Sequence, residues 1–256
     1  ELYAEISMSI IEPTSGLFII SPNGRNKVGL ANREVYIPFH AKPSDDKLIE
    51  LTKQERIDCY KAIGVFIGIV IRKGYYQDLP FAPFVWNGIA GTKISKEDVF
   101  AVDEEFKEFI MKLQDASNDV ALFEQLPQPI LWKCADWDGS MINISNPMKS
   151  QAVSFDQINT FISNCIKARI ESLTENINHI KDGFYENVGF AKKPTEKGSL
   201  YSRLAQGPLE ITVDQIKSIT DITLSLRNNF WMAVERMNNR QRSLLIKFIT
   251  GLPKIP

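Results

Sequence analysis

The chain has 256 residues, of which 30 are basic and 31 acidic, so its formal net charge is −1. This balance excludes a protein that binds nucleic acid through a large basic excess. Three cysteines without CxxC spacing argue against a disulfide framework and predict a reducing compartment. The longest apolar stretch, residues 62–71, is shorter than the roughly 20 residues that cross a bilayer, so no membrane partner is expected.

The start of the chain is expected to combine a helix with two short strands. Apolar residues recur at helical spacing from Leu2 onward, and Pro13 ends this first helix. Residues 16–20 and 35–39 are typical of strands, with a turn at residues 22–24 between them. These signals predict mixed secondary structure rather than helices alone.

A capping box marks the next helix. Thr52 stands three residues before Glu55, an arrangement in which each side chain bonds the other's backbone N–H. The helix is expected to run to about Lys73, where Gly74 ends it. Its GxxxG segment, residues 64–68, suits either a membrane dimer or a buried helix packed closely on a neighbour, and the short apolar length favours the second.

The middle of the chain alternates helix and hairpin signals. Ser95 and Asp98 form a second capping arrangement, and residues 104–115 carry an apolar stripe at helical spacing. Residues 127–147 are typical of strands and turns, with a hairpin corner at residues 138–139. A helix followed by a hairpin is therefore expected here.

The last third is expected to be helical. A capping box of Ser154 and Gln157 opens a long helix to about Ile180, and Gly183 is expected to begin a break after it. Three shorter helices should follow, and the predicted fold class is α+β, mainly helical. The expected positions of the later elements are a breaker at Gly207 and Pro208, a capped helix from Thr212, and helices at residues 229–237 and 240–249.

Common ligand motifs are missing from the sequence. The two histidines, His40 and His179, have no second His or Cys at zinc-ligand spacing. No phosphate-binding glycine loop and no GxSxG elbow occurs. Asp136 and Asp138 resemble the start of a calcium loop, but the downstream bidentate Glu is missing, so a hairpin turn is favoured. No metal and no cofactor is therefore expected.

The cysteines leave one alternative open. Cys59 and Cys165 fall on apolar faces of predicted helices and are expected to be small buried hydrophobes. Cys134, between Trp132 and Trp137, does not fall on the apolar face of a predicted helix, so a reactive thiol at this position is kept as an alternative. An unrelated enzyme that uses Cys134 or a carboxylate site is one alternative function.

Three segments, in this order, carry a family resemblance. Together they resemble the HECT domain of ubiquitin-protein ligases over nearly the whole chain, and residues 71–86 are most similar to the large HERC-type members. The segments are Ile63, Gly64, Ile67, Gly68 and Ile71 leading into Asp78–Pro83 and Trp86; Ser154 to Phe161; and Phe230, Trp231, Val234, Arg242, Leu245, Phe248, Thr250 and Gly251.

The resemblance implies a bilobed architecture. A larger N-lobe contains a small subdomain that binds an E2 ubiquitin-conjugating enzyme, and a short hinge joins it to a C-lobe. Carried onto this sequence, the N-lobe is residues 1–206 with the E2-binding subdomain at about 92–182, the hinge is Gly207, Pro208 and Leu209, and residues 210–256 begin the C-lobe.

The resemblance also implies the chemistry. The C-lobe of this family holds a cysteine that accepts ubiquitin as a thioester and passes it to a lysine of a protein substrate, since a thiolate is a strong nucleophile. None of the three cysteines matches that position, which is expected beyond Pro256, so no catalytic residue is expected in this chain. The implied partners are an E2, ubiquitin and a protein substrate, and the expected location is the cytoplasm, with the nucleus in addition.

The E2 groove is the part of the site that the resemblance places in this chain. Phe161 and Ile110 match groove positions of the family, and Phe106 and Leu113 lie one turn from Ile110 on the same stripe. The alternative is that all four pack the core of the subdomain, as aromatic residues on a helical stripe usually do. At the level of the whole protein, the alternative function is a HECT-like interaction scaffold without transfer activity.

Overall fold

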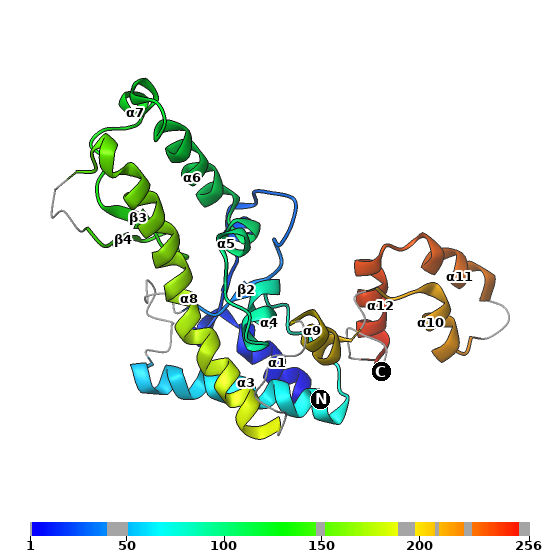
Figure 1. Ribbon diagram of the computed structural model, residues 1–256. Helices are drawn as coiled ribbons and strands as arrows, with labels where there is room; N and C mark the ends of the chain where they lie inside the picture. Colours follow the sequence, from blue (N-terminus) through cyan, green and yellow to red (C-terminus); the bar gives the residue numbers. More distant parts are fainter. Residues whose placement is uncertain are drawn as a thin grey trace.

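The computed structural model describes residues 2–39, 51–146, 152–188, 198–207, 210–222 and 227–250, and helices dominate them (Figure 1). Strands occur among these residues as two antiparallel pairs, β1–β2 and β3–β4, which confirms the α+β, mainly helical class. The α-helices are α1 (Leu2–Ile11), α2 (Pro22–Asn26), α3 (Lys53–Lys73), α4 (Pro83–Ile89), α5 (Lys96–Val102), α6 (Glu104–Ala116), α7 (Val120–Gln125), α8 (Ile158–Val188), α9 (Gly198–Gln206), α10 (Val213–Ile219), α11 (Arg227–Arg236) and α12 (Asn239–Thr250). The strands are β1 (Ile19–Ile20), β2 (Tyr36–Ile37), β3 (Lys133–Ala135) and β4 (Met141–Asn143).

Helices α3 and α8 cross in close contact, and glycines make the approach possible (Figure 1). A Cβ atom on Gly64 would lie 1.9 Å from the carbonyl oxygen of Ile180, and one on Gly183 would lie 1.9 Å from the carbonyl oxygen of Lys61. The two backbones therefore touch where neither residue has a side chain. This confirms that the GxxxG segment belongs to a buried helix packed on a neighbour.

Gly183 does not end the long helix, so the prediction of a break there was wrong. The helix α8 continues to Val188 and is 31 residues long. A glycine inside a helix costs about 1 kcal/mol relative to alanine. Here that cost is offset by the packing of α8 on α3, which no residue with a Cβ atom would allow.

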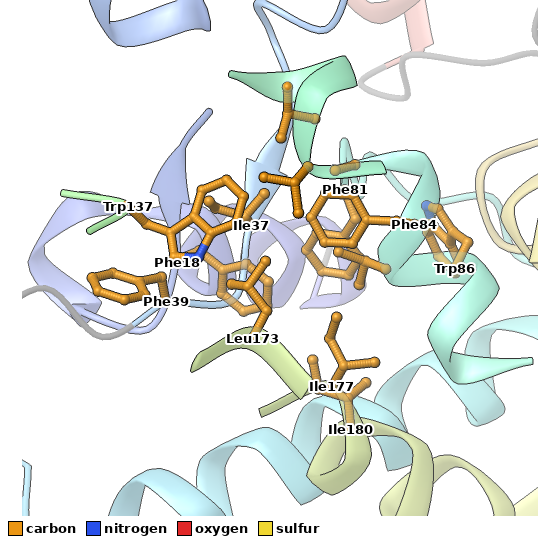
Figure 2. Packing of buried hydrophobic residues seen from close by; sticks show 14 of the residues in the cluster. Phe18, Ile37, Phe39, Phe81, Phe84, Trp86, Trp137, Leu173, Ile177 and Ile180 are labelled. Carbon is orange, nitrogen blue, oxygen red and sulfur yellow. The ribbon is translucent and has the colours of Figure 1, made fainter. Parts of the chain in front are cut away.

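An aromatic cluster fills the core beside this crossing. The rings of Phe18 and Phe81 stack with their centroids 4.8 Å apart, and Phe81 also packs on Trp86 at 5.6 Å. Figure 2 shows Leu173 and Ile177 of α8 next to this cluster. The core thereby joins the chain before β1, the turn before α4 and the middle of α8.

The short strands are anchored by a segment far along the chain. β1 pairs with β2, and the backbone of Tyr36 in β2 bonds that of Pro80 and Ala82. Both strands are shorter than the predicted residues 16–20 and 35–39. The helix α2 replaces the predicted turn at residues 22–24, since Ser21 caps its N-terminus through the N–H of Gly24. His40 lies outside the described residues.

All four capping boxes named in the sequence are present, and they begin α3, α5, α10 and the turn that leads into α8. At α5, Ser95 Oγ accepts from the N–H of Asp98 at 3.3 Å, and the Asp98 carboxylate accepts from the N–H of Ser95 at 2.8 Å. These bonds fix the start of the segment that leads to α6.

Ser95→Ala is expected to lower the free energy of unfolding by about 1 kcal/mol, the usual cost of losing an N-cap side chain. Urea unfolding followed by circular dichroism measures the change. Ser163→Ala is the control, because Ser163 is exposed within α8 and its hydroxyl donates to the Asn159 carbonyl of its own helix. An equal effect of both substitutions would contradict a capping role for Ser95.

The C-terminal helices α10, α11 and α12 have a small core of their own. Figure 1 draws them as a group apart from the other helices, and the core consists of Ile211, Ile216, Val234 and Ile246. The chain reaches this group through Gly207, which is buried and has φ +78°, a conformation that favours glycine. The other predicted hinge residues, Pro208 and Leu209, lie outside the described residues.

Candidate E2-docking groove

A groove of about 930 Å³ lies between α6, the β3–β4 hairpin and α8. Helix α6 lines it with apolar side chains, and α8 contributes Phe161 and Arg169. Three of the four predicted docking residues, Phe106, Leu113 and Phe161, line this groove. The structure therefore brings together side chains from two helices that are about fifty residues apart in the sequence.

Ile110, the fourth predicted residue, lies elsewhere. It is fully buried and does not line the groove, although it shares a face of α6 with Phe106 and Leu113. Phe109, one residue earlier, does line the groove and is 39% exposed. Within the apolar stripe of α6, Ile110 therefore belongs to the core, whereas Phe109 belongs to the groove.

The remaining apolar lining comes from the segment that runs from the end of α7 to Met141 in β4. The sequence predicted only strands and turns for most of this segment. Leu131 is 45% exposed and Met141 is 63% exposed, so both present apolar surface to solvent. Exposed apolar side chains that gather in one place mark interaction sites. The apolar residues around Pro127 and Pro129 are the sequence signal that could have indicated this part of the groove. The apolar lining residues of this segment are Leu126, Pro127, Ile130, Leu131, Cys134, Ala135 and Met141.

The floor of the groove holds a buried ion pair. Arg169 of α8 is 2% exposed and pairs with the carboxylate of Asp103, which also accepts from the N–H of Phe106 at 3.0 Å and so caps α6. The guanidinium lies over two aromatic rings, 4.6 Å from the centroid of Phe106 and 4.4 Å from that of Trp137. These two cation–π contacts stabilise a charge that is shielded from water.

Charge and hydrogen bonds link the hairpin to the same floor. The indole N–H of Trp137 donates to the carbonyl of Arg169 at 3.0 Å, and Arg25 donates to the carbonyl of Trp137 at 2.6 Å. Burial lowers the pKa of Arg169, and the neighbouring carboxylate of Asp103 opposes that shift. The polar end of the groove is thus built from α2, α6, α8 and the hairpin corner.

The three cysteines are free thiols. Cys59 is half-buried on α3, not buried as predicted, and desolvation raises the pKa of its thiol. Cys134 and Cys165 are buried, as expected for Cys165. Among the described residues there is no cluster of three or more His, Cys, Asp or Glu side chains that could hold a metal ion, and no helix there is long and apolar enough to cross a membrane.

Comparisons with known proteins agree with this architecture. A family model described as "HECT-domain (ubiquitin-transferase)" matches residues 4–256. The E3 ubiquitin-protein ligase HERC2 of Homo sapiens is 26% identical over the whole chain, and HECW2 of Mus musculus is 22% identical over the whole chain. TOM1 of Saccharomyces cerevisiae, also an E3 ubiquitin-protein ligase, is 22% identical over the whole chain. The chain spans 5% of HERC2, 16% of HECW2 and 7% of TOM1. A family model that covers nearly every residue shows the family: the chain belongs to the HECT-domain family.

Proposed function

We propose that this chain is the E2-docking part of an E3 ubiquitin-protein ligase. The groove between α6, the hairpin and α8 receives an apolar loop of a ubiquitin-charged E2, and a C-lobe cysteine of the intact protein takes the ubiquitin as a thioester and passes it to a lysine of a protein substrate. The observation that carries the proposal is the exposed apolar lining of this groove in a chain of the HECT-domain family.

The proposal assigns the lobes as residues 1–206 and 210–256, with the hinge at residues 207–209. The separate apolar cores on the two sides of Gly207 support this division. None of the three cysteines is assigned to the thioester, since Cys134 and Cys165 are buried and Cys59 is half-buried on α3, packed against the main core. Free thiols are consistent with the cytoplasm and the nucleus, which we propose as the location.

Phe109→Ala is expected to weaken E2 binding about tenfold while the protein stays folded. Phe109 lines the groove and is 39% exposed, so its truncation removes contact area for a partner at little cost to the core. Calorimetry with a panel of E2 enzymes measures the affinity. Phe161 is less suitable as a probe, because it is 1% exposed and its truncation leaves a cavity.

Met111→Ala is the matched control for this test. Met111 lies on α6, is 50% exposed and does not line the groove. It should leave the affinity unchanged. If both variants bind the E2 as tightly as the unmodified chain, the groove is not the docking site.

The transfer step is tested on the full-length protein. A ligase should form a ubiquitin adduct that disappears with a thiol reductant, because a thioester exchanges with thiols. A protein that binds the E2 through the groove but never forms this adduct would instead be the scaffold without transfer activity. Conversion of some other substrate by residues 1–256 alone would favour an unrelated enzyme.

A further inference from the structure

Helix α9 is held in place at both of its ends. It lies beside α4, and the chain continues from it to the C-terminal helices (Figure 1). At its first residue, Gly198, a Cβ atom would lie 2.3 Å from the amide nitrogen of Asn87, so the backbones of α9 and α4 touch there. Near its last residue, the carbonyl of Ala205 accepts from the N–H of Gln77 at 2.8 Å. The end of α9 therefore has a defined position on the N-terminal part of the chain.

The segment that receives the end of α9 is itself fixed by α1. Gln77 is 4% exposed, and its side-chain amide oxygen accepts from the hydroxyl of Ser7 at 3.1 Å. Ser7 is also buried, so this hydrogen bond is shielded from water. Tyr76, the residue before Gln77, is half-buried. Its backbone is therefore anchored next to α9 through Gln77, and its ring has a fixed base.

The ring of Tyr76 lies against Gly207, the first residue of the predicted hinge. A Cβ atom on Gly207 would lie 2.9 Å from Cγ, 3.0 Å from Cδ2 and 3.2 Å from Cδ1 of this ring. The ring therefore occupies the space that a side chain at this position would need. The N–H of Gly207 donates to the carbonyl of Arg203 at 2.8 Å, which ties the residue to the last turn of α9. Gly207 is thus still held by the N-terminal part of the chain.

The C-terminal helices hold the chain again four residues later. The N–H of Ile211 donates to the side-chain oxygen of Asn239 at 2.7 Å, and the carbonyl of Ile211 accepts from Arg242 at 3.2 Å. Only residues 208–210 separate Gly207 from Ile211 in the sequence. Four steps of at most roughly 3.6 Å limit the distance between their Cα atoms to about 14 Å. With so short a connection, the direction in which the chain leaves Gly207 restricts where the C-terminal helices can stand.

From this geometry we infer that Tyr76 is a positioning residue of the hinge. Its ring supports Gly207 and so sets the direction from which the C-terminal helices move. The inference deepens the proposed function and rests on it, because ubiquitin transfer requires the C-lobe cysteine to reach the thioester of an E2 in the groove, and reaction rates depend steeply on such positioning. Tyr76 acts in this step through Gly207 and does not touch the reacting atoms.

The contact is tested first without any E2 or ubiquitin. Spin labels at Met111→Cys on α6 and Met232→Cys on α11, which replace side chains that are 50% and 51% exposed, report the distance between the two groups of helices by pulsed electron resonance. The background is Cys59→Ser, which leaves only buried native thiols. Tyr76→Ala should broaden the distance distribution, because the chain at Gly207 loses its support. Tyr76→Phe keeps the ring and should leave the distribution narrow.

The matched control is Tyr75→Ala. Tyr75 is the neighbouring residue, is 50% exposed and packs on Tyr3 with their ring centroids 5.3 Å apart. This variant should leave the distribution unchanged. Gly207→Ala approaches the same contact from the other side, and its methyl group should shift the mean distance by forcing the hinge off the ring. An unchanged distribution in both Tyr76→Ala and Gly207→Ala, or equal broadening by Tyr76→Phe and Tyr76→Ala, would overturn the inference. Gly207→Ala decides the matter if Tyr76→Ala fails to fold.

The second experiment measures ubiquitin transfer in the full-length protein. With increasing ubiquitin-charged E2, Tyr76→Ala should lower the kcat of transfer about tenfold and leave KM unchanged, because positioning is lost while the docking groove is intact. Tyr76→Phe and Tyr75→Ala should keep the kcat of the unmodified protein. A broadened distance distribution with an unchanged or higher kcat would contradict the positioning role. If the unmodified protein transfers no ubiquitin, the proposed function fails, whereas the contact between Tyr76 and Gly207 is still decided by the distance measurement.

Discussion

Gly64→Ala is expected to lower the free energy of unfolding by about 3 kcal/mol, at the upper end of the usual cost of an overpacked core. The new methyl group would lie 1.9 Å from the Ile180 carbonyl oxygen and 2.6 Å from the Phe184 amide nitrogen. These are backbone atoms of α8, so no side chain can rotate away and the whole helix must move. Urea unfolding of the two variants Gly64→Ala and Gly183→Ala measures the loss.

The control and the double variant sharpen this prediction. Ile69→Ala also changes α3, but Ile69 is 38% exposed, so its truncation should cost clearly less. Gly64 and Gly183 lie at one crossing, so a first methyl group that separates the helices makes room for the second. The double variant should therefore lose less than the sum of the two. If Gly64→Ala and Gly183→Ala unfold at the same urea concentration as the unmodified chain, α3 and α8 are not in such close contact.

Arg169→Met is expected to cost about 3–5 kcal/mol, the usual effect of removing one partner of a buried ion pair. The substitution leaves the carboxylate of Asp103 buried without its guanidinium and removes the cation–π contacts to Phe106 and Trp137. Thermal and urea unfolding measure the loss.

The double variant Arg169→Met with Asp103→Asn separates charge from packing. Asn keeps an oxygen that can cap α6 while it removes the unpaired charge, so part of the stability should return. Lys167→Ala is the control: it removes an exposed ion pair with Glu171 on the same helix and should cost under about 1 kcal/mol. If Arg169→Met were no worse than Lys167→Ala, the pair would not be shielded from water.

The local signals in the sequence predicted most of the fold. The capping boxes depend on two side chains three residues apart, so the sequence contains the whole interaction, and all four form as expected. The helices α3, α6, α11 and α12 begin and end within about two residues of their predicted limits, and α10 begins directly after its predicted cap at Thr212. The short helices α2, α4 and α7 were missed, because segments of five to seven residues hold too few turns to show a periodicity.

The misplaced features depend on contacts between distant segments. Nothing near Gly183 in the sequence indicates that Lys61 lies against it, so a glycine that lets two helices touch was taken for a helix end. The groove shows the same effect. The stripe of α6 identifies Phe106 and Leu113 correctly as inward-facing, but only the positions of α8 and the hairpin decide that Phe109 faces the groove and Ile110 the core.

The length of α8 ties the glycine crossing to the groove mechanically. Phe161 stands near one end of this single helix and Gly183 near the other, 22 residues apart, which at 1.5 Å per residue is about 33 Å. The crossing with α3 therefore helps to set the direction of the axis that carries Phe161 to the groove. A change of about 5° in that direction at Gly183 would move the Phe161 end by roughly 3 Å over this length, which is comparable to the width of a methyl group. A substitution at the crossing that tilts α8 should consequently change the shape of the groove without altering any residue that lines it.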